Sequence, residues 1–183
     1  VPADGDVVSF ALLGDGRGVA FLADLASDEV VEAWLVSLTT GATPRRLSEP
    51  LTAGGDVLEL VVAPDASHVF YRADARADER FELFSVPLGR VRRPEPHAIR
   101  LNATLAPGAG VRWFFLDPAR RRVLYGIDPV MTDPWWEAEY FSVAMDGGVS
   151  SPLDIPRPES SVQRATGSGL VLGLGPRERI YGA

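Results

Sequence analysis

Short apolar runs separated by turn residues recur along the whole chain. Residues 18–24, 68–74 and 122–128 each have an apolar, strand-like centre and end in aspartate, and they start 50 and then 54 residues apart. A turn signal precedes each run: Gly14-Asp15-Gly16, Pro64-Asp65-Ala66 and Asp117-Pro118-Ala119. Proline presets φ for a turn, aspartate bonds back to the backbone, and glycine accepts positive φ. We therefore interpret Asp15 and Asp65 as turn formers.

Three further runs repeat with nearly the same period. An apolar run opens each unit at 7–13, 57–63 and 111–116, an aromatic-rich run follows the aspartate at 34–38, 84–88 and 141–145, and a short run closes each unit at 46–48, 100–102 and 152–154. Four short β-like runs within about 50 residues are typical of one blade of a β-propeller.

The repeats predict an all-β chain that forms a β-propeller-type array of four-stranded antiparallel blades. We place the blades at residues 6–51, 55–105 and 109–156, with a half blade at 161–183, all in a single domain of residues 1–183. Arg, Glu and Leu would favour a helix at 75–84. The equivalent runs of the other units contain Val30, Val31, Trp34, Tyr140 and Phe141, which favour strands, so we expect a strand there too.

The second unit resembles the repeat of TolB-like (WD40-like) β-propellers. Residues 63–74, followed by 81–88, match the family pattern, in which a Pro-Asp-Gly turn joins two strands and an aromatic strand comes next. The first unit has Gly14-Asp15-Gly16 at the turn, and the third has Asp117-Pro118 in reversed order. The resemblance implies a module that binds other proteins through its loops and central channel, in a periplasmic or other extracytoplasmic location.

A propeller of about three and a half blades does not close, since closed rings typically have about four to eight blades. An open array leaves blade faces and sheet edges exposed, which favours aggregation. We therefore expect either a homodimer that completes the ring or a missing remainder of the propeller.

Composition and charge exclude several function classes. The net charge of −7 argues against nucleic acid as the main partner, because phosphate binding needs a basic surface. The absence of cysteine excludes disulfides, thiolate catalysis and cysteine-bound metals, and two histidines are too few for a histidine-rich metal site. No apolar run is long enough to span a membrane. We expect neither a cofactor nor a metal.

Sorting the loops by blade topology separates the charges. Loops between the second and third strands of each unit fall on one end of the array and are acidic: Asp24, Asp28, Glu29, Asp74, Asp78, Glu79, Asp128 and Asp133. Loops on the other end carry arginines: Arg17, Arg90, Arg92, Arg93, Arg120, Arg121, Arg122, Arg177 and Arg179. This pattern predicts an acidic and a basic face that attract oppositely charged partners; the alternative is that the loops are charged for solubility.

The candidate partner-binding residues come from the same acidic loops. Asp24, Asp74 and Asp128 recur at equivalent positions and either form a ring of carboxylates or cap strand ends through bonds to the backbone. Trp135 and Trp136, beside Asp133, lie in a proline-bounded loop of the third unit. Adjacent strand residues point to opposite faces, so one tryptophan is a candidate partner anchor; packing between blades is the alternative.

Catalytic patterns are weak in this chain. No Gly-x-Ser-x-Gly nucleophile elbow occurs, and the glycines at 14, 16 and 18 lack the spacing and context of a dinucleotide site. We predict a non-catalytic protein-interaction module that resembles a TolB-like propeller. The alternative is the access-gating propeller of a prolyl oligopeptidase-type serine peptidase whose hydrolase domain is absent from this chain, and a carbohydrate-binding or carbohydrate-cleaving propeller is a third hypothesis.

Overall fold

In a computed structural model, residues 5–89, 97–130 and 138–154 of the chain are described, and their regular elements are all β-strands. The strands are β1 (Val7–Leu12), β2 (Gly18–Ala23), β3 (Glu32–Ser37), β4 (Arg45–Arg46), β5 (Val57–Val62), β6 (His68–Ala73), β7 (Glu82–Pro87), β8 (Ile99–Arg100), β9 (Gly110–Asp117), β10 (Arg122–Asp128), β11 (Glu139–Ala144) and β12 (Ser151–Leu153).

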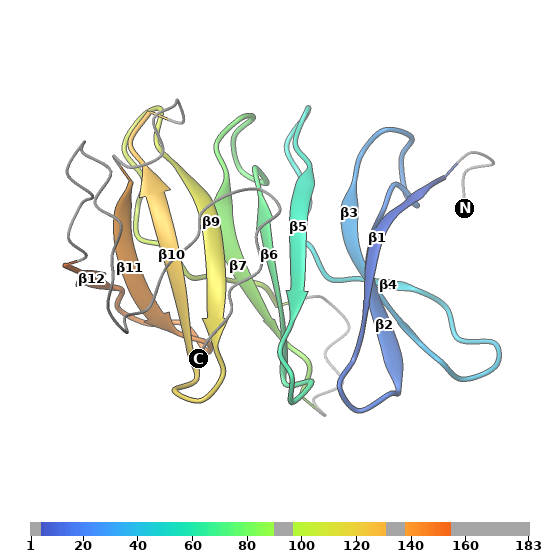
Figure 1. Ribbon diagram of the computed structural model, residues 1–183. Coiled ribbons are helices and arrows are strands. Elements are labelled where there is room, and N and C mark those ends of the chain that lie inside the picture. The colour runs from blue at the N-terminus through green and yellow to red at the C-terminus, as the bar shows by residue number, and fades with distance from the viewer. Residues whose placement is uncertain (1–4, 90–96, 131–137, 155–183) are drawn as a thin grey trace, which may run out of the picture.

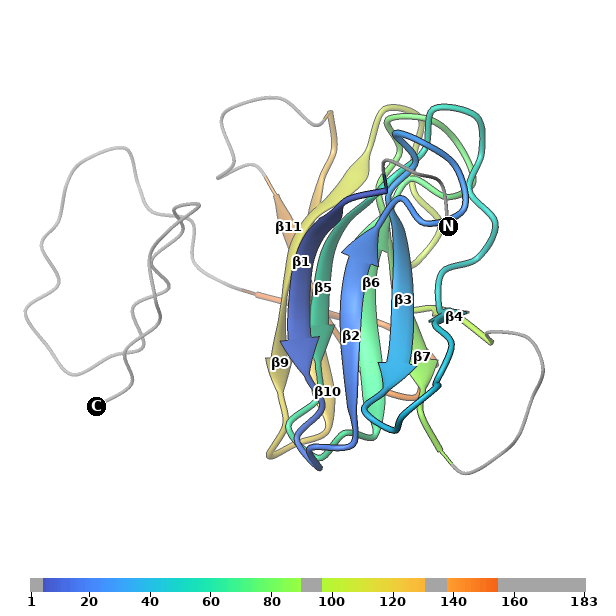
Figure 2. The same cartoon turned by 90° about the vertical axis from the view of Figure 1, so that its right-hand side faces the viewer.

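The strands form three separate four-stranded antiparallel sheets, each built from strands consecutive in sequence. We name them blade 1 (β1–β4), blade 2 (β5–β8) and blade 3 (β9–β12). Figure 1 shows the blades side by side, and Figure 2 shows them stacked behind one another. The all-β, propeller-type prediction is confirmed. The segment 75–84 is not a helix; its residues 75–81 form a loop, and the strand expected there begins only at Glu82. The predicted half blade at 161–183 lies outside the described residues.

Alternation along the strands builds two apolar layers between the blades. In β2, Ala20 and Leu22 face blade 2, because they pair with Leu35 and Ala33 on the same side of the sheet. The layer between blades 1 and 2 also contains Tyr71 and Phe84, whose rings stack with centroids 4.9 Å apart. A second layer joins blades 2 and 3; its fully buried members are Phe70, Leu83, Val111, Val123, Tyr125 and Val143.

The turns between the first two strands confirm the interpretation of Asp15 and Asp65. Asp15 Oδ1 accepts a hydrogen bond from the Arg17 amide at 3.0 Å, and Asp65 Oδ1 accepts one from the Ser67 amide, also at 3.0 Å. Gly16 has φ 69°, and Ala66 takes the same position in the second turn with φ 54°. The resemblance in sequence between the two turns therefore reflects one backbone conformation.

The first strand of every blade is interrupted at the same point. The pairing register shifts between Val7 and Ser9 in β1 and between Val57 and Glu59 in β5, and the β9–β10 pairing skips one residue of β9. The bulge residues are Val8, Leu58 and Arg112. Bulges bend a strand and redirect one side chain, so the three blades share this feature as well as their strand order.

Candidate functional site

The β2–β3 and β6–β7 loops lie together at one end of the array, the top in Figure 1, which we call the upper end; the turns between the first two strands of the blades lie at the lower end. The upper end carries the candidate residues Asp24, Asp74 and Asp128, each of which follows or ends the second strand of its blade. All three are at least nine-tenths buried.

Asp24 and Asp74 use their carboxylates to hold the backbone. Asp24 Oδ1 accepts a hydrogen bond from the Asp6 amide, and Asp74 Oδ1 accepts the equivalent bond from the Asp56 amide at 2.6 Å. Asp74 Oδ2 accepts a further bond from the Glu79 amide at 2.9 Å. These bonds confirm the capping interpretation for the pair. Binding of a partner by these aspartates stays a prediction.

Asp128 uses its carboxylate differently. Its Oδ1 accepts from the Val130 amide at 3.1 Å, while its Oδ2 accepts from Arg112 Nη1 at 2.9 Å. The difference has a local cause: the bulge residue of blade 3 is an arginine, Arg112, where Val8 and Leu58 stand in the other blades, and it supplies a charged donor to the Asp128 carboxylate. Asp133, Trp135 and Trp136, the other candidate residues of this loop, lie outside the described residues.

The two complete upper loops have the same backbone and expose the same charges. Glu29 and Glu79 have φ 57° and 59°, and each loop closes with a matching bond, Val30 N to Ser27 O at 3.2 Å and Arg80 N to Ala77 O at 3.1 Å. Asp28, Glu29, Asp78 and Glu79 are all exposed. Within the described residues, none of these four carboxylates forms an ion pair.

The lower end is not a basic face in the part of the chain that the structure describes. Arg120 pairs with Asp117 at 2.9 Å, and Arg121 Nη1 pairs with Asp65 Oδ2 at 3.1 Å. Arg122 belongs to β10, and its guanidinium donates to Ser142 on the neighbouring strand. In the described residues the aspartates of the turns neutralise the arginines beside them, so a basic face is not found there, and for the rest of the predicted set the basic face stays a prediction. The remaining arginines of that set, other than Arg17, are outside the described residues.

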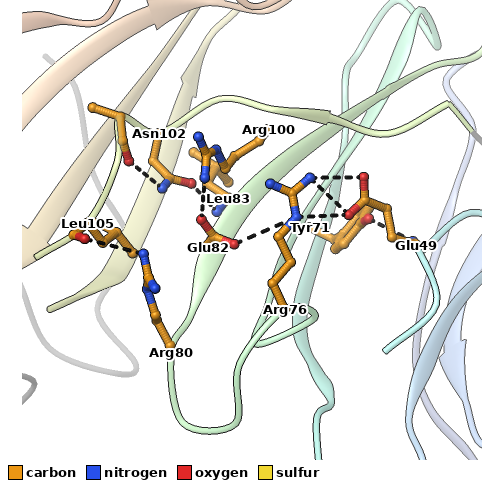
Figure 3. Close-up of polar contacts among 10 residues, drawn as sticks. Glu49, Tyr71, Arg76, Arg80, Glu82, Leu83, Arg100, Asn102 and Leu105 are labelled. Atoms are coloured by element: carbon orange, nitrogen blue, oxygen red, sulfur yellow. Dashed lines mark hydrogen bonds and ion pairs between the residues drawn. The ribbon is translucent and has the colours of Figure 1, made fainter. Parts of the chain in front are cut away.

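A polar cluster that sequence reasoning missed joins blades 1 and 2 near the upper end (Figure 3). Glu82, which is 2% exposed, accepts from Arg100 Nη1 at 3.0 Å and lies 4.0 Å from Arg76 Nε. Arg76 also pairs with Glu49 of the β4–β5 loop at 3.1 Å. The Glu49 amide donates to the Tyr71 hydroxyl at 3.1 Å, and burial raises the pKa of Tyr71. The cluster therefore fixes blade 2 against the loop that leaves blade 1.

The same close-up shows side chains that form hydrogen bonds with backbone groups near the ends of the blade 2 strands (Figure 3). Asn102 Oδ1 accepts from the Leu83 amide at 2.8 Å, and Arg80 Nη2 donates to the Leu105 carbonyl at 3.2 Å. Buried backbone groups must find such partners because an unpaired amide costs about 1–3 kcal/mol. These contacts pair buried polar groups of blade 2 and so stabilise the blade.

A second cluster, at the lower end, links blades 2 and 3. His68, which is 3% exposed, places Nε2 3.0 Å from Asp146 Oδ1 and Nδ1 2.9 Å from Ser67 Oγ. The set resembles a Ser–His–Asp constellation, but Ser67 Oγ lies 2.6 Å from Asp65 Oδ1. A serine has one hydroxyl proton, and here it is directed to a carboxylate rather than to the imidazole. We interpret the cluster as a contact between blades.

An ion pair joins β5 and β6 of blade 2 on the side that faces blade 3. Arg72 Nε is 3.5 Å from Glu59 Oε2, and Arg72 Nη1 donates to the Val111 carbonyl at 3.3 Å. Burial raises the pKa of Glu59 and lowers that of Arg72, while the attraction between the two charges opposes both shifts. The pair is thus partly desolvated, and its hydrogen bonds tie blade 2 to blade 3.

In the part of the chain that the structure describes, no group of three or more His, Asp or Glu side chains is arranged to hold a metal ion. No helix in that part of the chain has the length and apolar character needed to cross a membrane.

Comparison with protein-family models and with curated protein sequences gives no match. Solved structures do match. The one described as "putative TolB from Agrobacterium tumefaciens" has a TM-score of 0.54 at 12% identity, over 80% of this chain and 48% of that one. Prolyl oligopeptidase B from Galerina marginata also has a TM-score of 0.54 at 12% identity, over 82% of this chain and 20% of the other. A puromycin hydrolase matches with a TM-score of 0.54 at 15% identity, over 82% and 22%.

This chain therefore spans about half of the TolB-type structure and about a fifth of the two enzymes. At these identities the likeness concerns the fold, which hosts many functions. The chain has a β-propeller-like fold, shared with a TolB-type protein and with enzymes of the prolyl oligopeptidase type.

Proposed function

We propose that the chain is a non-catalytic propeller module that binds a positively charged segment of a protein partner at its upper end. The observation that carries the proposal is the exposure of Asp28, Glu29, Asp78 and Glu79, at equivalent positions of two loops and without ion pairs in the described residues. An exposed carboxylate with no cation beside it is available to a basic partner.

The frame beneath these acids supports a binding role. Asp74 holds the start and the turn of the β6–β7 loop through its bonds to the Asp56 and Glu79 amides. Arg76, which could otherwise neutralise the neighbouring acids, is engaged by Glu49 and Glu82. A preorganised loop loses less conformational freedom on binding, so more of the electrostatic attraction appears as affinity.

The test is binding of a fluorescent synthetic peptide of alternating arginine and serine. We expect salt-sensitive binding that weakens about tenfold when Asp28, Glu29, Asp78 and Glu79 are changed together to Asn or Gln, because rim charges each contribute a fraction of a kcal/mol. A matched control removes four negative charges at the lower end, through Asp15→Asn, Asp65→Asn, Asp117→Asn and Asp146→Asn. Equal weakening in both variants would show that only net charge matters and would contradict the proposal.

The alternative function is the access-gating propeller of a prolyl oligopeptidase-type peptidase. It is favoured by the likeness to prolyl oligopeptidase B and to a puromycin hydrolase, each of which is about five times longer than the part that this chain matches. The sequence of the transcript that encodes this chain separates the two. An α/β-hydrolase domain in the same reading frame supports the peptidase alternative, and further propeller repeats alone support the interaction module.

A further inference from the structure

Blade 1 has an apolar sheet face that no described element covers. Pairing places Phe10, Phe21 and Trp34 in one row across β1, β2 and β3, and Leu12, Val19 and Val36 in the next row. Phe10 is 72% exposed and Leu12 63% exposed. Figure 2 looks onto this side of the molecule, with β1, β2 and β3 nearest the viewer. We call it the open face of blade 1.

The internal repeat shows what such a face does when it is covered. In blade 2 the equivalent rows are Leu60, Tyr71 and Phe84, then Val62, Val69 and Val86. All six belong to the apolar layer between blades 1 and 2, and Tyr71 and Phe84 have no exposed surface. The open face of blade 1 therefore has the residue pattern of a face built to pack on another blade.

Backbone bonds follow the same repeat. The Val57 amide donates to the Val31 carbonyl at 2.9 Å, and the Val31 amide donates to Asp56 Oδ1 at 2.8 Å. Two consecutive residues of blade 2 therefore form hydrogen bonds with both backbone groups of one residue of blade 1. Asp6 and Val7 occupy the equivalent positions of blade 1 and are exposed. Within the described residues, the Asp6 carboxylate makes no hydrogen bond or ion pair.

A buried carboxylate oxygen marks the rim of the open face. Glu32 and Glu82 start the third strands of their blades and bond Arg46 at 2.9 Å and Arg100 at 3.0 Å. The second oxygen of Glu82 lies 4.0 Å from Arg76, whereas Oε2 of Glu32 is buried with no hydrogen-bond partner in the described part of the chain. Ala26 stands where Arg76 stands in blade 2. A buried acceptor left unpaired is costly, and a donor from outside blade 1 would relieve it.

Blade 3 offers the complementary surface at the far end of the array. Its outward side carries Trp113, Phe115, Leu124, Tyr140 and Leu153, at positions equivalent to those by which blade 1 covers blade 2 and blade 2 covers blade 3. These side chains are half-buried. The Trp113 ring fills the space beside Gly126, because two of its carbon atoms lie 2.6 Å from the position that a Cβ would take there. Within the described residues, one chain thus presents both halves of a blade-to-blade contact.

We propose that the open face of blade 1 binds the outward side of blade 3 of a second copy of the chain. The contact is head to tail, and two such contacts close a ring related by a two-fold axis. Two copies of the three described blades make six blades, within the range of about four to eight found in closed propellers. In this ring, Asp6 and Val7 form hydrogen bonds with the backbone of the partner copy, as Asp56 and Val57 do with Val31.

The first test is the mass of the chain by analytical ultracentrifugation across micromolar concentrations. We expect a species of twice the chain mass, and we expect Phe10→Asp to abolish it while the monomer keeps its circular dichroism, since Phe10 is exposed in a single copy. Val149→Asp is the matched control, because Val149 is 91% exposed and lies outside both faces. A wild-type monomer at every concentration, or a dimer that survives Phe10→Asp, overturns the proposal.

The second test fixes the geometry of the contact and exploits the absence of cysteine in the chain. Chains carrying Phe10→Cys and chains carrying Phe115→Cys are mixed and oxidised. Head-to-tail packing predicts disulfides between the two kinds of chain, because both positions lie on first strands that become neighbours across the contact. Crosslinks only between two Phe10→Cys chains would show that open faces pair with each other and would contradict the proposed ring.

Discussion

Replacing Phe84 with alanine is expected to lower the free energy of unfolding by about 4 kcal/mol, the largest effect of any single truncation that we predict. Phe84 has no exposed surface, its ring stacks on that of Tyr71 at 4.9 Å, and the Arg76 guanidinium lies 5.5 Å from its centroid. The substitution leaves a cavity in the layer between blades 1 and 2, and both blades lose packing at once. Denaturation by urea, followed by intrinsic fluorescence, measures the change.

Phe84→Leu is the control for this prediction. Leucine keeps most of the buried volume, so the expected loss is about 1 kcal/mol, as for other swaps that nearly conserve volume. If Phe84→Ala costs less than about 1 kcal/mol, the side chain is not buried between two blades, and the stacking of blade 2 on blade 1 is wrong.

The second large effect is expected at Gly14, where alanine should destabilise the chain by about 3 kcal/mol. A Cβ at this position would lie 2.0 Å from the Pro64 carbonyl oxygen and 3.1 Å from its carbon, far inside van der Waals contact. Backbone atoms cannot rotate away as a side chain can, so the turn of blade 1 must separate from the turn of blade 2. Thermal and urea denaturation of Gly14→Ala measure the loss.

Gly89→Ala is the matched control for Gly14→Ala. Among the described residues, chain neighbours apart, no atom lies within 4 Å of the Cβ that alanine would add there. We expect its stability to stay within about 0.5 kcal/mol of the wild type, as for most surface substitutions. Equal stabilities for the two variants would mean that the turns of blades 1 and 2 are not in contact.

Strand order and turn chemistry could be predicted from the sequence because both depend on neighbouring residues. The recurrence of an apolar run ending in aspartate placed the second strand of blade 2 at 68–74, and β6 is His68–Ala73. The recurrence of Asp24 and Asp74 allowed two interpretations, a ring of carboxylates or capping of strand ends, and the backbone bonds of the structure decide for capping. The donors of these bonds, the Asp6 and Asp56 amides, lie 18 residues before their acceptors in both blades. The same bond therefore recurs at the same spacing in the two repeats.

The polar contacts between blades could not be predicted from local patterns. Glu49, Arg76, Glu82 and Arg100 come from separate segments, and only the stacking of blades brings them together. One signal was present, since Glu32 and Arg46 stand in blade 1 where Glu82 and Arg100 stand in blade 2. Counting arginines by loop also ignored the aspartates of the neighbouring turns, such as Asp65 beside Arg121, so the described part of the lower end is not basic.

The open face shows why blade stacking matters for function as well as for stability. Tyr71 and Phe84 have no exposed surface in the rows of blade 2, whereas Phe10 and Leu12, in the matching rows of blade 1, are exposed, and the sequence alone does not distinguish the two cases. The exposed acids of the upper loops likewise gain their common orientation from two blades with matching loop backbones. The binding proposals therefore depend on three separate sheets that repeat one another in space.

Mapping strand pairs by nuclear Overhauser effects between backbone protons tests that repetition most directly. We expect cross-strand contacts within residues 6–48, 52–102 and 110–153, in the order of three antiparallel four-stranded meanders. Between the described blades, backbone contacts are expected at the Gly14 and Pro64 turns and at the Val57–Val31 and Val111–Phe81 bonds, and the other contacts involve side chains. Backbone pairing between strands of different repeats, as in one continuous barrel or sandwich, or helical contacts at 75–84, would contradict the blade architecture.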